Sequence, residues 1–244
     1  MNRDVTSDFL SEIQNSNVKP IEPVFLDFKK DLSQLKAKSN IPVLYKQNTS
    51  NDLFQLIYVF DMGNNNDKVL GTAFDYIDYL GTSDMTPEQL KSEFYRLACT
   101  FRVVPGNERT YVLLSGLNEN MPEAMKLFEK LMADAQVNKE AYTNMVADIL
   151  KSRKDAKLNQ MQNFRRLMSY GMYGPKSPAT NILTEAELQN MDPQELIDRI
   201  HNQNSYQHRI LYYGPTSEKE LLAIINKNHQ APKKLKEIPI GNEF

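Results

Sequence analysis

The sequence predicts an α+β fold, in which an antiparallel sheet of about four to five strands packs against a layer of helices. Short runs rich in branched and aromatic residues occur in pairs separated by turn residues, which is typical of hairpins. Longer segments with apolar residues three and four positions apart occur in blocks, rather than alternating one by one with the strands. These blocks argue against a parallel sheet built from alternating strand and helix units.

The first half of the chain has the clearest element boundaries. Thr86-Pro87-Glu88-Gln89 combines an N-cap, a proline at the first helical position and a capping-box Gln, which predicts a helix start. The elements that we expect are a short helix near 24–37, strands at 41–45 and 53–60 that form a hairpin through the turn 47–52, a helix at 67–80 ended by Gly81, and the helix that begins at Thr86.

The second half is mostly helical after one more hairpin. Thr184 with Glu187, and Asp192 with Glu195, repeat the capping-box spacing. The elements that we expect are strands at 100–104 and 109–114 joined by Pro105-Gly106-Asn107, a helix at 124–135, a long helix at 139–170, helices after Thr184 and Asp192, a strand at 208–213 and a helix at 217–228.

Composition and charge exclude several classes of protein. The 29 Lys and Arg residues nearly balance 31 Asp and Glu residues, giving a net charge of −2 and no general attraction for nucleic acid or an anionic membrane. No apolar run approaches the roughly 18 residues that a membrane span needs. The polar stretch 1–19 lacks the apolar core of a signal peptide. We therefore expect neither a nucleic-acid nor a membrane partner.

The termini differ in composition from the middle of the chain. Residues 1–22 are polar and read as a linker or tail, and residues 231–244 hold prolines and lysines and read as a C-terminal linker. We expect one α+β domain over 23–230 between them. This arrangement is typical of a piece of a longer chain, although two frayed termini would look the same.

The residues that could carry chemistry do not form a self-contained active site. His201 and His208 are seven positions apart without acidic residues at ligand spacing, so they are expected to be surface or packing side chains. Cys99 is the sole cysteine and is expected to be a free core thiol. Glycine-rich phosphate loops and the GxSxG motif are absent. The turn 63–67 precedes a helix and is explained by capping.

One segment resembles a known peptidase family. It reads F-Q-L-I-Y-V-F-D-M-G-N-N-N-D-K-V-L-G-T-A-F-D-Y-I-D-Y-L-G-T from Phe54 to Thr82, and it is followed by T-P-E-Q-L-K-S-E-F-Y and R-T-Y-V-L-L-S-G-L-N-E-N. This resembles the insulysin–pitrilysin (inverzincin) zinc metallopeptidases, in which a strand ending in Gly leads to a helix that carries H-x-x-E-H and closes with Gly-Thr. The resemblance covers roughly residues 40–230 and implies the mitochondrial-processing-peptidase-like, LuxS-like fold.

The catalytic motif itself is absent. Counting back from Gly81-Thr82, its five positions fall on Thr72-Ala73-Phe74-Asp75-Tyr76, so both histidines are lost and the Glu is replaced by Asp75. Neutral hydroxyls and one carboxylate are poor zinc ligands. The family's third ligand lies on a later helix, where Asp148 and Asp155 are the nearby acids, and we assign that role to neither. We expect no catalytic, cofactor-binding or metal-binding residue and no cofactor in this chain.

The resemblance therefore implies a non-catalytic domain from the C-terminal half of a larger bacterial zinc peptidase. Such a domain encloses the proteolytic chamber and helps to hold peptide substrate. Its partners are the sister domains with the H-x-x-E-H half, which holds the zinc, and it exposes an apolar docking patch. The alternative is a stand-alone inactive member acting as a scaffold or assembly subunit, which lacks such a patch. A hydrolase built on Asp75 is a third, less favoured hypothesis. Related bacterial peptidases are periplasmic, which makes the periplasm the expected compartment.

Overall fold

The computed structural model describes residues 6–23, 25 and 27–244, and it divides into two units, Met1–Asp31 and Leu32–Phe244. The first unit contains α1 (Asp8–Asn15), whose N-cap Ser7 accepts a hydrogen bond from the N–H of Leu10. The second unit begins at Leu32 and includes residues 231–244. The expected single domain over 23–230 stays a prediction. The roles of 1–22 and 231–244 as linkers stay predictions.

The second unit contains a six-stranded sheet with the order β1-β2-β6-β3-β5-β4 among its described residues. Neighbouring strands run antiparallel except β2 and β6, which are parallel. The predicted α+β class is confirmed, with one strand more than we expected. The strands are β1 (Ser33–Lys36), β2 (Pro42–Gln47), β3 (Leu53–Phe60), β4 (Cys99–Pro105), β5 (Thr110–Leu117) and β6 (His208–Gly214).

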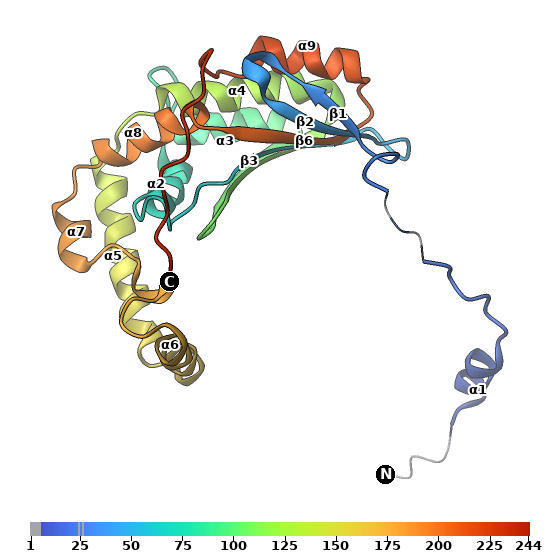
Figure 1. Ribbon diagram of the computed structural model, residues 1–244, viewed down its shortest axis with the longest axis horizontal. Coiled ribbons are helices and arrows are strands. Elements are labelled where there is room, and N and C mark those ends of the chain that lie inside the picture. Colours follow the sequence, from blue (N-terminus) through green and yellow to red (C-terminus); the bar gives the residue numbers. More distant parts are fainter. Residues whose placement is uncertain (1–5, 24, 26) are drawn as a thin grey trace. The chain divides into compact units, whose positions relative to one another are not determined.

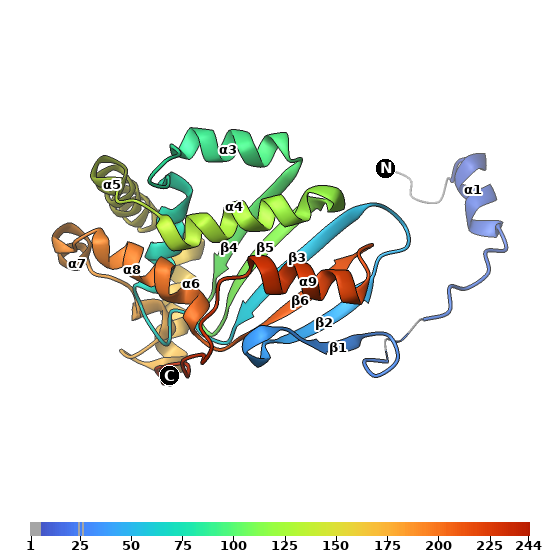
Figure 2. The same cartoon turned by 90° about the horizontal axis from the view of Figure 1, so that it is seen from above.

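Helices α3, α4 and α9 lie over one face of the sheet, while α2, α5, α7 and α8 gather beyond one end of it (Figures 1 and 2). The helices are α2 (Leu70–Tyr76), α3 (Pro87–Arg96), α4 (Met121–Asp134), α5 (Lys139–Ala156), α6 (Gln160–Tyr173), α7 (Glu185–Asn190), α8 (Gln194–Asn202) and α9 (Glu218–Asn228). Short 3-10 turns include η2 (Ile77–Tyr79), η4 (Pro178–Thr180) and η5 (Gln203–Ser205).

The core lies between the sheet and this helical layer. Phe128 of α4 is fully buried and packs against Tyr58 of β3 and Phe101 of β4, with ring centroids 6.5 and 5.3 Å apart. Burial of one such side chain stabilises the fold by about 1.5–3 kcal/mol. The apolar stripe predicted for 124–135 is thus the surface that holds α4 on the sheet.

The helix expected near 24–37 is not formed over its C-terminal half, and residues 24 and 26 lie outside the described residues. Residues 33–36 form strand β1 instead, paired with β2 so that Leu35 lies opposite Val43. Leu35 and its neighbours alternate between half-buried and exposed, which is the period of a strand. Pairing with β2 satisfies the backbone of this short segment, and this outweighs its helical spacing.

The expected hairpin between 41–45 and 53–60 is also wrong. Both segments are strands, but β6 lies between them and pairs with each. The turn that follows β2 is instead organised by Asn48, whose side chain donates to the carbonyl of Leu53 and accepts from the N–H of Ser50. A strand from the far end of the chain can insert here because β2 and β3 each bury one face on the same core.

The long helix expected at 139–170 is two helices. α5 ends at Ala156, and Asn159 begins α6 by accepting a hydrogen bond from the N–H of Gln162 at 3.0 Å. Asn163 also donates to the carbonyl of Lys157 at 2.7 Å, which closes the break. An Asn side chain can replace the helical hydrogen bonds of the backbone in this way. The break was missed because the helical spacing of apolar residues continues through it.

The remaining predicted elements are formed. The capping box of Thr86 with Gln89 opens α3, and that of Thr184 with Glu187 opens α7. The hairpin β4–β5 is formed. At Asp192 the expected capping box is replaced by a shorter bond, in which Asp192 accepts from the N–H of Gln194 at 3.0 Å.

Candidate functional site

The start of the degenerate-motif helix α2 is fixed by contact with the β4–β5 turn. The N–H groups of Asn64 and Asn65 donate to the carbonyls of Gly106 and Asn107 at 2.9 and 2.8 Å. A Cβ atom on Gly63 would lie 2.4 Å from the oxygen of Gly106. The two backbones therefore approach closely enough that only glycine fits at position 63.

The end of this region is fixed in the same way. The N–H of Thr82 donates to the carbonyl of Met85 at 2.9 Å, and a Cβ atom on Gly81 would lie 2.3 Å from that same oxygen. The carbonyl of Gly81 accepts from the N–H of Gln136 at 3.0 Å. The two glycines of the strand–Gly–helix–Gly-Thr pattern therefore stand where the backbone makes close contacts at either end of α2.

Tyr76, which was predicted to occupy the position of the motif's second histidine, is a buried packing residue. Its hydroxyl donates to the carbonyl of Asn138 at 2.5 Å and accepts from the N–H of the same residue at 2.8 Å. Asn138 is the N-cap of α5, and the ring of Tyr142 meets that of Tyr76 edge-on at 5.8 Å. Burial raises the pKa of Tyr76. Its neutral hydroxyl therefore joins α2 to the start of α5.

Asp75 faces a cleft rather than a ligand set. The cleft has a volume of about 600 Å³ and lies between α2, β4 and α5, where Asp148 also lines it. Asp75 is an exposed residue, yet partial desolvation by the cleft walls, and secondarily the charge of Asp78, raise the pKa of its carboxyl group. Arg102 and Arg153 line the same cleft, so its walls carry charges of both signs.

The motif positions do not fit zinc. The Tyr76 oxygen already uses both of its hydrogen-bonding roles on the backbone, Thr72 offers a neutral hydroxyl, and Asp75 is one carboxylate. Within residues 6–23, 25 and 27–244, no group of three or more His, Cys, Asp and Glu residues is placed to hold a metal ion. We therefore derive no step that uses a metal in this chain, and the expected lack of zinc stays a prediction.

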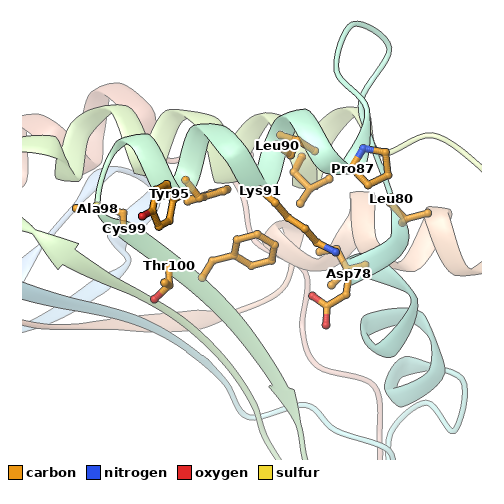
Figure 3. Close-up of a pocket in the computed structure, with 13 residues that line it drawn as sticks. Asp78, Leu80, Pro87, Leu90, Lys91, Tyr95, Ala98, Cys99 and Thr100 are labelled. Carbon is orange, nitrogen blue, oxygen red and sulfur yellow. The ribbon is translucent and has the colours of Figure 1, made fainter.

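Next to this cleft, an apolar cavity of about 640 Å³ separates α3 from β4 (Figure 3). It is lined by Leu90 and Phe94 of α3, by Phe101 of β4 and by Leu80, which follows η2. At one end the side chains of Lys91 and Asp78 point toward one another (Figure 3). The cavity has the size and lining to take a bulky apolar side chain.

Strand β4 is an edge of the sheet, because among the described strands it pairs with β5 alone. The N–H of Gly106 donates to the carbonyl of Arg109, which makes these two a hydrogen-bonded pair of the antiparallel ladder. Val104 and Arg102, two and four positions before Gly106, face β5 in the same way. Phe101 and Val103 lie an odd number of positions from Gly106, so their N–H and C=O groups point away from β5, toward the free edge. An extended chain could pair with these groups.

The sheet face opposite the helices carries an apolar row. Leu44, Leu211, Ile57 and Leu113 lie side by side across β2, β6, β3 and β5, and each is half-buried. Arg102 of β4 ends the row, opposite Leu113. A continuous apolar strip of this kind on a sheet favours contact with apolar polypeptide.

The histidines and the cysteine are placed differently from one another. His201 is exposed on α8, whereas His208 is buried where β6 begins, and its ring nitrogen contacts that of His229. This pair was not predicted from the sequence, because the two residues belong to different elements. Cys99 is a buried free thiol as predicted, and burial raises its pKa.

Structural comparison identifies the architecture. An M16 peptidase inactive domain from Pseudomonas fluorescens superposes with a TM-score of 0.68 over 86% of this chain and 54% of that one, at 14% identity. The chain has the fold of M16 peptidase domains. The periplasmic protease PqqL from Escherichia coli matches with a TM-score of 0.75 at 13% identity, over 96% of this chain and 29% of PqqL.

A third structure, the ferredoxin protease FusC in complex with Arabidopsis ferredoxin, matches with a TM-score of 0.70 at 12% identity, over 92% of this chain and 27% of FusC. The chain thus spans between about a quarter and a half of these proteins. The resemblance to insulysin–pitrilysin peptidases is confirmed at the level of the fold. No sequence-family profile matches the chain, and no curated protein is detectably similar in sequence.

In the part of the chain that the structure describes, no helix has both the length and the apolar character that crossing a membrane would require.

Proposed function

We propose that this chain is a non-catalytic domain of an insulysin-like M16 peptidase, which encloses the proteolytic chamber and helps to hold peptide substrate. The observation that carries the proposal is Tyr76. It sits in an M16 peptidase fold at a motif position, and its hydroxyl is committed to the backbone of Asn138. The M16 domain from Pseudomonas fluorescens is itself described as inactive.

Peptide holding is supported by three neighbouring features. The free N–H and C=O groups of Phe101 and Val103 offer main-chain pairing to an extended peptide. The cavity between α3 and β4 opens beside this strand and would take a bulky apolar side chain. The apolar row that ends at Arg102 starts from the same strand and lies on the opposite face of the sheet from this cavity. Main-chain pairing with one side-chain pocket gives affinity for extended peptides with little dependence on sequence.

The apolar stripe of α6 favours a domain that docks on others over a stand-alone scaffold. Met161, Phe164, Met168 and Met172 recur at helical spacing and are 58%, 54%, 49% and 66% exposed. Contiguous exposed patches of this kind mark interaction sites. Among the described residues, this stripe best matches the docking patch that we expected, and the sister domains of the peptidase are its proposed partners. Because PqqL is a periplasmic protease, we propose the periplasm as the compartment.

A peptide-binding measurement tests the proposal. Val103→Pro removes an N–H that faces the free edge, and it leaves the hydrogen bonds to β5 in place. Binding of dye-labelled oxidised insulin B chain, followed by fluorescence anisotropy, should weaken roughly tenfold, since a lost main-chain bond and the steric block act together. The free chain should not cleave the peptide.

The matched control is Gln34→Pro, on the opposite edge of the sheet. The N–H of Ala37 donates to the carbonyl of Ile41, so Gln34, an odd number of positions away, points its own N–H outward. This variant should bind the peptide as the wild type does. Equal loss in both variants, or cleavage of the peptide, would contradict the proposal. So would one zinc ion held per chain after dialysis, measured by elemental analysis.

A further inference from the structure

Three titratable side chains form a continuous line through the core. His229 Nδ1 lies 2.6 Å from Glu129 Oε1, and His229 Nε2 lies 2.8 Å from His208 Nε2. His208 Nδ1 lies 2.7 Å from the carbonyl oxygen of Tyr206. Glu129, His229 and His208 are 1%, 0% and 6% exposed. The line joins α4, the end of α9 and the start of β6.

The partners at the ends of this line fix where its protons are. The carbonyl of Tyr206 can only accept, so Nδ1 of His208 carries its proton and Nε2 of His208 is an acceptor. The proton between the two rings therefore belongs to Nε2 of His229. His208 is the neutral member of the pair.

Glu129 is surrounded by donors. Its carboxylate accepts from the hydroxyl of Tyr58 at 3.0 Å, the side-chain amide of Asn204 at 2.9 Å and the N–H of Gln230 at 3.0 Å. A carboxyl group with this many donors is an ionised acceptor, so Nδ1 of His229 donates to it as well. His229 thus carries both ring protons and forms a buried ion pair with Glu129.

This ion pair also anchors the C-terminal segment, residues 230–242. Gln230 begins the segment and is bonded directly to Glu129. Further along, the N–H of Lys236 donates to the carbonyl of Ser205 at 2.8 Å, and its carbonyl accepts from Gln207 at 3.0 Å. Near its end, the side chain of Asn66 donates to the carbonyl of Pro239 at 2.8 Å. The segment is therefore attached at Glu129, at the residues just before His208 and at Asn66.

His208 is the residue of the line that we expect to take up a proton from solvent. It lines a cavity of about 570 Å³ that is bounded on one side by the C-terminal segment. Several charged and titratable groups face His208, either along the line or across this cavity. They are Tyr58 on β3, Glu129 on α4, His229 after α9, Arg209 on β6, Asp61 after β3, and Lys233, Lys234 and Glu237 on the segment. Asp61 is bound to Arg109 and Arg209 and so is already paired.

We propose that Glu129, His229 and His208 form a proton relay that acts as a pH-sensitive latch on the C-terminal segment. A proton that enters from the cavity binds Nε2 of His208. Two N–H groups then face each other across the His208–His229 contact, and that hydrogen bond is lost. Repulsion between two imidazolium rings displaces His229 from Glu129 and, with it, Gln230. The segment loses its attachment at Gln230 and opens from that end, and deprotonation of His208 restores the attachment.

The direction of the effect follows from His208. Burial, and then the charge of His229, lower the pKa of His208 from its ordinary value of about 6.5 to about 4, while the carbonyl of Tyr206 opposes the shift. In the open state His208 is taken to have its ordinary pKa. Between about pH 4 and 6.5 the closed state therefore binds fewer protons than the open state. Closure is favoured above about pH 6.5 and is lost as the pH falls toward 4. Between pH 7 and pH 5 the opening constant should rise about 20-fold.

Hydrogen exchange measured by mass spectrometry tests the latch. The full chain is labelled at pH values from 7 to 5, and the rates are corrected for intrinsic exchange. Amides of residues 230–242 should open about 20-fold more at the lower pH. His208→Gln keeps an acceptor for His229 but cannot titrate, so its segment should show no such rise. His201→Gln, at an exposed histidine on α8, should behave as the wild type does.

Two results would overturn the proposal. One is a segment whose opening is the same at pH 7 and pH 5 in the wild type, and the other is an undiminished rise in His208→Gln. If that variant fails to fold, nitrogen NMR of the wild-type imidazoles decides. The proposal requires a neutral His208 with its proton on Nδ1, and a His208 titration that coincides with segment opening. Titration of His208 without opening also overturns it.

Discussion

The hydroxyl of Tyr76 makes two hydrogen bonds to one backbone unit, at Asn138. Tyr76→Phe removes the hydroxyl and leaves a buried carbonyl and N–H without that partner, so we predict a loss of about 1–3 kcal/mol in the free energy of unfolding. Urea denaturation measures it. Tyr95→Phe is the matched control, because Tyr95 is 88% exposed, and it should change stability by less than about 0.5 kcal/mol. Equal losses in the two variants would contradict the role given to Tyr76.

Single residues also show where sequence reasoning stops. The loss of the motif histidines could be read from positions 72–76, but the bonds of Tyr76 to Asn138 could not, because they join residues 62 positions apart. Glu129 left a signal that went unused: it is a carboxylate within the apolar pattern of α4, next to Phe128. A buried carboxylate needs partners, yet its distance of 100 positions from His229 hides which one.

Helix α6 differs from the other long helices because every one of its side chains is at least partly exposed. An isolated helix of about this length is marginal in water, and burial of an apolar face is what normally stabilises it. We predict that amides of α6 exchange at least about tenfold faster than those of α4, which has the same number of residues and buries seven of them. Hydrogen exchange of the free chain measures both helices at once.

The stripe of α6 offers a second test of this prediction. Replacing Phe164 and Met168 by Ser should leave the urea midpoint of the free chain nearly unchanged, because neither side chain is buried. The matched double change at Met125 and Phe128 of α4 should destabilise the fold by several kcal/mol, since both are fully buried. Protection of α6 equal to that of α4, or a large loss from the α6 changes, would mean that the stripe packs within this chain.

Elements whose ends depend on hydrogen bonds between near neighbours in the sequence were predicted well. Elements that depend on pairing with a distant strand were predicted poorly. The capping boxes at Thr86 and Thr184 fixed two helix starts, because the bonds span three residues. β1 was wrongly predicted as part of a helix, because four residues are too few to distinguish the two-residue period of a strand from the 3.6-residue period of a helix. The hairpin between β2 and β3 was wrong because nothing near residue 50 signals that β6, some 160 positions later, pairs with both.

The arrangement of the second unit explains why the fold was easier to predict than the site. Gly63 and Gly81 mark close backbone approaches that hold α2 against the β4–β5 turn and the end of α4. Such contacts depend on residue type at one position, and none of them involves a metal ligand. The features proposed to hold peptide, the free edge of β4 and the cavity beside α3, arise from strand order and helix placement. A sequence shows neither.

The stability of the protein should fall in two separate pH ranges as the solution is acidified. His208 has its pKa lowered to about 4, so it contributes stability that is complete above about pH 6.5 and lost as the pH falls to about 4, an effect of about 3 kcal/mol. Hydrogen bonds from Lys68 and from Thr184 lower the pKa of Glu187 to about 2, and Arg209 likewise lowers that of Asp61. These carboxylates contribute stability above their ordinary values of about 4, which is lost at lower pH.

The two declines are separable by mutation. Urea midpoints measured across this pH range should fall first between about pH 6.5 and 4, and again below it. His208→Gln should flatten the first decline and keep the second, because the carboxylates are unchanged. Asp61→Asn should do the reverse, with a smaller effect, since the aspartate is half-exposed and solvent screens its ion pairs. Parallel curves for the wild type and His208→Gln would show that the titration of His208 is not coupled to folding.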